Sequence, residues 1–263
     1  MRRKWFIPMA TFALASGSML AVTGAAAAST TSSSHPAAVQ PGGVAQHLVT
    51  PFGSHGHKAT TSSNWSGYAA SGTAGRFTSV SASWTEPATK CSSGNQYSSF
   101  WVGLDGYKSR TVEQTGSESD CNGSRSVYSA WWEMYPGGSH NFSNPVRPGD
   151  RFTASVTYAG GSSYTLKIAD TTAGWSHTLT KSLASGQRSS AEVIVEAPCC
   201  TAGGGILPLA DFGKASFTSA TVNGSPIGNA SPTKINMASG GIQKDSVSAL
   251  SGGNSFTATW LHR

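Results

Sequence analysis

Four glutamates in the body of this chain have the surroundings of β-strands, and carboxylates held on rigid strands can work as general acids or bases. They are Glu113, Glu133, Glu192 and Glu196. Because strands are poor in Glu, such a residue is either the solvent-facing partner of an alternating strand or part of a polar site. For Glu196 the sequence favours a polar site, because Ala197-Pro198 follows it directly, ends the strand and leaves the carboxylate near the strand's end.

Gln114 is the second polar residue that its local sequence singles out. It precedes Thr115-Gly116, where the backbone can turn or approach a ligand closely. The spacing alone goes no further: it indicates two polar residues, Gln114 and Glu196, on strands that lie far apart in the sequence.

The sequence supports a catalytic triad with a nucleophile less well than a site built on carboxylates. The chain has no Gly-x-Ser-x-Gly motif, and beyond residue 60 its histidines are His140, His177 and His262, each in a turn-like context typical of the surface. These observations disfavour a Ser/His/Asp triad.

The cysteines fit disulfides better than catalysis or metal binding. All of them fall in the body, at Cys91, Cys121, Cys199 and Cys200. In an exported protein the default is two disulfides, for which three pairings are possible. The chain has no Cys-x-x-Cys, and its His-x-His, at residues 55–57, lies away from every cysteine. We therefore expect no metal and no cofactor.

The N-terminus has the pattern of a secretory signal peptide. Met1-Arg2-Arg3-Lys4 precedes an apolar run from Trp5 to about Val22, and a string of alanines up to Ala28 offers a cleavage site. A retained membrane anchor is the alternative, but Pro8 and several polar residues interrupt the run. We assign residues 1–28 to the signal peptide and expect a secreted, extracellular protein.

Residues 29–62 are expected to be a disordered, basic leader or propeptide. They are rich in Ser, Thr, Ala, Pro and Gly and contain no Asp or Glu. Four of the eighteen Lys and Arg precede residue 61, whereas all twelve acidic residues lie at or beyond Glu86, so the net charge of +6 falls to 14 − 12 = +2 for the body. This balance does not favour nucleic acid as a partner. The leader could cover a carboxylate-lined cleft at neutral pH, or it could be only a spacer for secretion.

The body, residues 63–263, has the pattern of one all-β domain. Apolar residues alternate with polar ones in 152–158, 164–168 and 256–260, and Gly- and Ser-rich turns at 159–162, 223–226 and 251–254 separate such runs. Short strands with regular turn signals predict an antiparallel sandwich or barrel. Alternation also predicts that Glu192 and Glu196 share one face, as do Trp131, Glu133 and Tyr135.

The body resembles the glutamic peptidases, or eqolisins, over nearly all of residues 63–222, and it is identified as a secreted, bacterial-type member of that family. The resemblance is carried, in order, by Ser63-Asn64-Trp65-Ser66-Gly67-Tyr68, Trp101-Val102-Gly103-Leu104-Asp105-Gly106, Glu113-Gln114-Thr115-Gly116, Tyr128-Ser129-Ala130-Trp131-Trp132-Glu133-Met134-Tyr135-Pro136, Ala191-Glu192-Val193-Ile194-Val195-Glu196 and Ala210-Asp211-Phe212-Gly213.

The resemblance implies an antiparallel β-sandwich of two bent sheets, concanavalin- or lectin-like, with the cleft on the concave face. It places the catalytic glutamine on Gln114 and the catalytic glutamate on Glu196. It also implies residues that line the cleft or support the pair, and so bind substrate: Trp65, Trp101, Asp105, Glu133 and Tyr135. Two departures bear on the site region. A family disulfide is absent, and Ser129 stands where a carboxylate is often found.

The implied activity is secreted, acidic endopeptidase cleavage of peptide bonds. Glu196 would take a proton from water as general base, and the Gln114 amide would stabilise the oxyanion. The expected partners are protein or peptide substrates, with no nucleic acid, no membrane in the mature form and a monomeric enzyme. We expect activity to rise as Glu196 ionises and to fall when a second carboxyl, Asp105 or Glu133, loses its proton.

Two other functions remain open from the residues. A carbohydrate-binding, lectin-like sandwich would explain the eight Trp and seven Tyr without catalysis. A glycosidase would use two carboxylates, for instance Glu133 with Glu196, and would tolerate the loss of Gln114.

Overall fold

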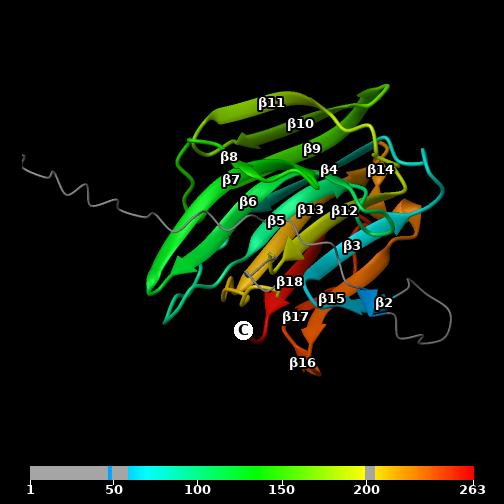
Figure 1. Cartoon of the computed structure of the whole chain (residues 1–263). Coiled ribbons are helices and arrows are strands. Elements are labelled where there is room, and N and C mark those ends of the chain that lie inside the picture. Colours follow the sequence, from blue (N-terminus) through cyan, green and yellow to red (C-terminus); the bar gives the residue numbers. More distant parts are fainter. Residues whose placement is uncertain (1–46, 49–58, 199–204) are drawn as a thin grey trace, which may run out of the picture. The chain divides into compact units, whose positions relative to one another are not determined.

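The computed structural model describes residues 47–48, 59–198 and 205–263 (Figure 1). The expected signal peptide, most of the leader, Cys199 and Cys200 lie outside these ranges. Among the described residues, none belongs to a helix with the length and apolar character needed to cross a membrane.

The described strands form two sheets (Figure 1). The larger has ten strands, in the order β1 (His47–Leu48), β2 (Ala59–Ser62), β15 (Thr233–Ser239), β3 (Trp65–Ser71), β12 (Ser190–Glu196), β5 (Ser99–Leu104), β6 (Val112–Asn122), β7 (Arg125–Tyr135) and β8 (His140–Asn141), with β16 (Ile242–Gln243) against β15. The smaller has eight, in the order β11 (Trp175–Ser182), β10 (Ser163–Asp170), β9 (Arg151–Gly160), β4 (Ser79–Thr85), β13 (Lys214–Val222), β18 (Phe256–Trp260) and β17 (Asp245–Val247), with β14 (Ser225–Pro226) against β13. A 3₁₀ helix, η1, covers Ile227–Ala230.

The predicted β-sandwich is confirmed. The alternating runs at 152–158, 164–168 and 256–260 lie in β9, β10 and β18, and their apolar residues enter a core shared with the larger sheet. Phe100 and Val102 of β5 meet side chains such as Phe152 in this core. One pairing differs from a wholly antiparallel fold, because β2 runs parallel to β15.

A second buried apolar cluster lies on the opposite face of the larger sheet. It consists of Trp65, Ala69, Trp101, Val112, Trp131, Ile194 and Ile235. Alternation places Glu196 on this face with Ile194, and Glu133 with Trp131. We call it the site face. The four strand glutamates are at most 2% exposed, so the explanation that they face solvent is wrong.

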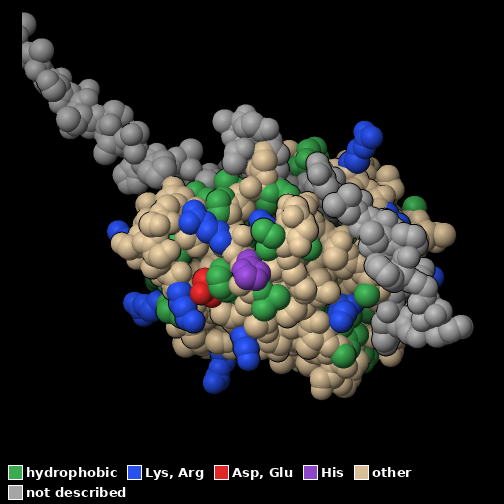
Figure 2. Space-filling view, turned by 90° about the horizontal axis from the view of Figure 1, so that it is seen from below, with side chains coloured by type: hydrophobic (Ala, Val, Ile, Leu, Met, Phe, Trp, Pro, Cys, Tyr) green, Lys and Arg blue, Asp and Glu red, His purple; other side chains and the backbone are tan. Residues whose placement is uncertain are grey.

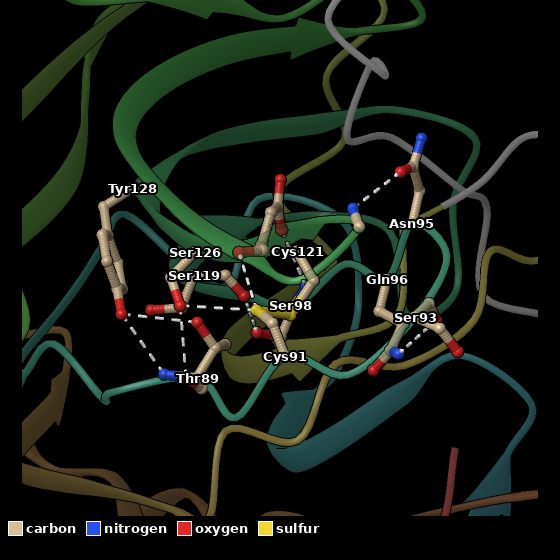
Figure 3. Close-up of a disulfide and its surroundings, with 12 residues drawn as sticks. Thr89, Cys91, Ser93, Asn95, Gln96, Ser98, Ser119, Cys121, Ser126 and Tyr128 are labelled. Atoms are coloured by element: carbon tan, nitrogen blue, oxygen red, sulfur yellow. Dashed lines mark hydrogen bonds between the residues drawn. A yellow bond between two sulfur atoms is a disulfide. The ribbon is translucent and has the colours of Figure 1, made fainter.

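A disulfide joins Cys91 to Cys121, which is one of the pairings that the sequence allows (Figure 3). Cys91 precedes β5 and Cys121 lies near the end of β6, where Gln96 also pairs with Cys121 through the backbone. The bond therefore fixes the segment that leads into β5 against the strand that carries Gln114. Cys199 and Cys200 lie outside the described residues.

We expect the double variant Cys91→Ser, Cys121→Ser to unfold at a lower temperature. The bond closes a loop with a sequence separation of 30. Closing such a loop restricts the unfolded chain and is worth about 3–4 kcal/mol. For a domain of this size the midpoint should fall by roughly 10 °C. Thermal denaturation followed by circular dichroism, beside the oxidised wild type, measures the shift, and an unchanged midpoint would contradict the stabilising role.

Candidate active site

Gln114 and Glu196 lie on the site face, on the two strands that flank β5. Glu196 of β12 is in register with Ser99 of β5, and Gln114 of β6 is in register with Gly103. Trp101 lies midway between those two positions of β5. Because alternate residues of a strand share a face, Gln114, Trp101 and Glu196 all project the same way. The sheet therefore brings together two residues that the sequence separates widely.

Two side-chain donors hold the Glu196 carboxylate. The Trp101 indole Nε1 donates to Oε2 over 2.9 Å, and the Asn64 amide Nδ2 donates to Oε1 over 3.3 Å. Glu196 is 1% exposed, so these bonds replace hydration that the carboxylate would have in water. A carboxylate that accepts N–H bonds is stabilised in its ionised form, which is the form a general base needs.

The Gln114 side-chain amide uses only part of its hydrogen-bonding capacity. Its Nε2 donates to Glu133 Oε2 over 2.9 Å, and Glu133 sits directly across from it on β7. Its Oε1 is buried and has no hydrogen-bond partner. An amide carries two N–H donors and an acceptor oxygen, so one donor and the oxygen remain for a ligand.

Glu133 is buried beside the pair, and its proton affinity is high. Burial, and next the charge of Glu196, raise the pKa of Glu133 to about 9, while the bond from Gln114 acts in the opposite direction. At acidic and neutral pH Glu133 is therefore a neutral carboxylic acid next to Gln114.

The indole of Trp101 needs glycines around it. A Cβ on Gly116 would lie 2.5 Å from the Trp101 Cβ, and one on Gly103 would lie 2.9 Å from the Trp101 ring. Trp65, which is in register with Glu196, meets the Trp101 ring edge-on at a centroid distance of 4.9 Å. The motifs around Trp65 and Trp101 thus build the seat of Glu196.

Two other predicted site residues, Tyr135 and Asp105, lie in different surroundings. Tyr135 is half-buried at the end of β7 and packs against the site-face cluster. Asp105 is fully buried just after β5 and accepts four hydrogen bonds, from the backbone N–H groups of Gln187, Arg188 and Ser189 and from the Ser189 hydroxyl. Asp105 therefore anchors the loop before β12, and none of these bonds reaches Gln114 or Glu196.

Sequence reasoning missed two residues of the site face. Glu118 lies four residues beyond Gln114 on β6 and is in register with Ser129 of β7. It accepts a hydrogen bond from the Ser129 hydroxyl over 3.0 Å. A carboxylate is therefore present directly opposite position 129, although Ser129 itself is not one. Burial is the main cause that raises the pKa of Glu118 well above its usual range. Strand alternation from Gln114 would have found it. Asn64, which binds Glu196, had no such signal.

The other two strand glutamates, Glu113 and Glu192, lie on opposite faces of the larger sheet. Glu113 points into the core between the sheets, where burial raises its pKa to about 9, and neither of its oxygens has a hydrogen-bond partner. Glu192 lies on the site face in register with Gly103, and burial raises its pKa well above the usual range. Both are thus neutral structural groups at acidic pH.

The acidic and basic side chains of this protein differ in their burial. All twelve acidic residues lie in the described part of the chain, and each is buried or half-buried. The Lys and Arg residues of the same part are exposed or half-buried. Figure 2 shows one face on which Lys and Arg are scattered while acidic side chains hardly appear. Within the described ranges no group of three or more His, Cys, Asp or Glu is arranged to hold a metal ion.

We expect the folded protein to become less stable as pH rises from about 4 to 8. Burial, as the largest cause, raises the pKa of Glu86 and Asp245 to about 7 and that of Glu113 to about 9. Their unfolded values are about 4. Between these limits the folded state keeps protons that the unfolded state has released, so stability is full below about pH 4 and is lost as pH approaches the folded values.

Melting temperatures measured from pH 4 to 8 test this expectation. Each group lowers stability by up to about 1.4 kcal/mol per pH unit inside its window. Glu113→Gln removes one titrating group that is outside the pair, and it should flatten the dependence. A melting temperature that rises across this range in the wild type would contradict the assignment.

A β-sandwich that holds a glutamine and a glutamate on one sheet face has the architecture expected of a glutamic peptidase. The comparison with protein families agrees: residues 63–260 match the model of the Peptidase A4 family, so the chain belongs to that family.

Two fungal proteins are similar in sequence. Aspergillopepsin-2 of Aspergillus niger is 31% identical over 172 residues, which cover 62% of this chain and 59% of that protein. Scytalidopepsin B of Scytalidium lignicola is 34% identical over 146 residues, or 53% of each. The matches span little more than half the length of these relatives. Both are fungal, so the bacterial type expected from the sequence stays a prediction.

Solved structures match the fold as well. A scytalido-glutamic peptidase with a transition-state analogue inhibitor superposes with a TM-score of 0.66 at 26% identity, covering 76% of this chain and 98% of that one. The aspergilloglutamic peptidase of Aspergillus niger gives a TM-score of 0.56 at 30% identity, covering 63% and 99%.

Proposed function

We propose that this protein is a secreted endopeptidase that hydrolyses peptide bonds in acid with Glu196 and Gln114. One observation carries the proposal: the Glu196 carboxylate is fixed by two donors on the same face as the Gln114 amide oxygen, which has no partner. A fixed acceptor and a partly free amide suit a reaction that needs a base and an oxyanion donor. The disulfide between Cys91 and Cys121 is consistent with secretion.

The proposed reaction begins with a water molecule between the two side chains. Glu196 accepts one proton of the water, Gln114 Oε1 accepts a hydrogen bond from the other, and the water oxygen adds to the scissile carbonyl carbon. The Gln114 N–H that does not bind Glu133 donates to the resulting oxyanion. Glu196 then transfers its proton to the amide nitrogen, the C–N bond breaks, and acid and amine products leave.

Both members of the pair should be essential. Gln114→Ala removes the oxyanion donor and should lower kcat by roughly 10²–10³. Glu196→Gln removes the base and should abolish turnover. Gln96→Ala is a matched control, because Gln96 is similarly buried but donates to Ser93 O, away from the pair.

The assay is cleavage of denatured protein between pH 2 and 7, with an aspartic-protease inhibitor present. Cleavage that persists in the inhibitor and in Gln96→Ala, but not in the two site variants, supports the proposal. Glycoside cleavage that survives Gln114→Ala would favour a glycosidase with Glu133 and Glu196. Sugar binding without cleavage would favour the lectin-like alternative.

The alkaline limit of activity is assigned to Glu133. As a neutral acid it accepts the Gln114 bond without adding a second negative charge near Glu196, and ionisation towards its pKa of about 9 would add that charge. Glu133→Gln keeps an acceptor oxygen but cannot ionise, so the alkaline limb of kcat/KM should move to higher pH or disappear. The acid limb should stay in place.

Glu118→Gln is the matched control for this profile. Glu118 is a second buried carboxyl on the site face, and Ser129 binds it in place of Gln114. An alkaline limb that moves in Glu118→Gln and not in Glu133→Gln would overturn the assignment.

A further inference from the structure

The strand just before the family match belongs to the sheet that carries the site. The match begins at residue 63, and β2 ends at Ser62. β2 pairs in parallel with β15 from Ala59 to Ser62, and β1 adds to its outer side. We had expected these residues in a disordered leader. Ser62 is instead 1% exposed, as deeply buried as the site residues.

The link from β2 to β3 has little freedom. In the sheet order β15 lies between β2 and β3, so Ser63 and Asn64 carry the chain from one side of β15 to the other, near Met237, which is in register with Ser62. Strands two places apart are separated by roughly 9–10 Å. The three Cα steps from Ser62 to Trp65 reach at most about 11 Å. Pairing of the strands on both sides therefore fixes the position of Asn64.

The Ser62 hydroxyl fixes the orientation of the Asn64 side chain. It donates to Asn64 Oδ1 over 3.2 Å and accepts the backbone N–H groups of Trp65 and Asn64 over 3.1 and 3.4 Å. Because the amide oxygen faces Ser62, the amide nitrogen faces the other way, where it donates to Glu196 Oε1. The backbone of Asn64 also holds this end of β12, since Ala197 N–H donates to Asn64 O over 2.8 Å.

We propose that Asn64 is a positioning residue for the general base and that Ser62, at the end of β2, sets its orientation. The mature enzyme therefore keeps residues 59–62, and its maturation cleavage lies upstream of Ala59. This inference rests on the proposed function of Glu196. Two buried carboxyl groups, Glu133 of β7 and Glu118 of β6, interact electrostatically with Glu196. A negative charge on either would oppose ionisation of Glu196, whereas the Asn64 and Trp101 donors support its ionised form.

The first experiment measures kcat/KM against pH for four variants made in the full chain. Asn64→Ala removes a donor from ionised Glu196, so its acid limb should move up by about half to one pH unit, which lowers kcat/KM at acid pH by roughly three- to tenfold. Ser62→Ala should shift the limb in the same direction by less, and Ser62→Thr, which keeps the hydroxyl, should restore it. Asn236→Ala is the matched control: Asn236 of β15 accepts a hydrogen bond from the Val247 N–H of β17, and β15 is not a neighbour of β12, the strand of Glu196.

The outcomes separate this inference from the proposed function. An acid limb in the wild-type position for both Asn64→Ala and Ser62→Ala, or one that Asn236→Ala shifts equally, would overturn the positioning role. If Asn64→Ala fails to fold, the Ser62→Ala and Ser62→Thr pair still decides the question. Wild type without peptidase activity, or Glu196→Gln with it, would mean that the proposed function itself fails.

The second experiment is N-terminal sequencing of the active, secreted enzyme. The expected N-terminus lies at or before Ala59. A fully active enzyme that begins at Ser63 or later would contradict the role of β2.

Discussion

The hydrogen bond from the Trp101 indole to Glu196 is the contact around which the site face is arranged. For this N–H to reach the carboxylate, the indole must lie flat against its own sheet, which is possible because Gly103 and Gly116 present no side chains there. Trp65 then closes one side of the ring. The strands on either side of β5 bring the carboxylate and the amide to the two ends of the same aromatic group. Packing thus sets the spacing of Gln114 and Glu196, whereas their hydrogen bonds set the orientation of the two side chains.

Burial of so many carboxyl groups imposes the second constraint. An isolated buried carboxylate costs several kcal/mol, so each group must lose its charge or find donors. Glu196 has the indole and amide donors, whereas Glu113, Glu133 and Glu192 have pKa values raised by burial and hold their protons. The proposed mechanism needs Glu196 ionised while these neighbours stay neutral. Their raised pKa values keep the neighbours protonated in acid, which links the pH range of the proposed reaction to the stability of the sheet that carries it.

Strand alternation predicted much of the fold because a strand exposes its two faces in strict turn. It correctly predicted that Glu192 shares a face with Glu196, and Trp131 with Glu133. Alternation cannot show whether other residues cover a face, so it could not predict the burial of Glu113 and Glu133. The choice of Gln114 over other polar residues came from the family resemblance and not from spacing. The hydrogen bonds of Asp105 could not be predicted, because its partners are backbone N–H groups, which have no sequence signature.

Residues 59–62 were placed in the leader for a related reason. The string Ala59-Thr60-Thr61-Ser62 lacks the alternating apolar residues that mark a core strand, and its place next to β15 depends on main-chain pairing. Pairing of this kind is specified by the partner strand, more than a hundred residues away in the sequence. A leader that ends in such a strand cannot be removed completely without exposing the edge of β15 and releasing the Ser62 hydroxyl from Asn64. The larger sheet therefore includes the last residues of the expected leader, and in the proposed mechanism these residues support the general base.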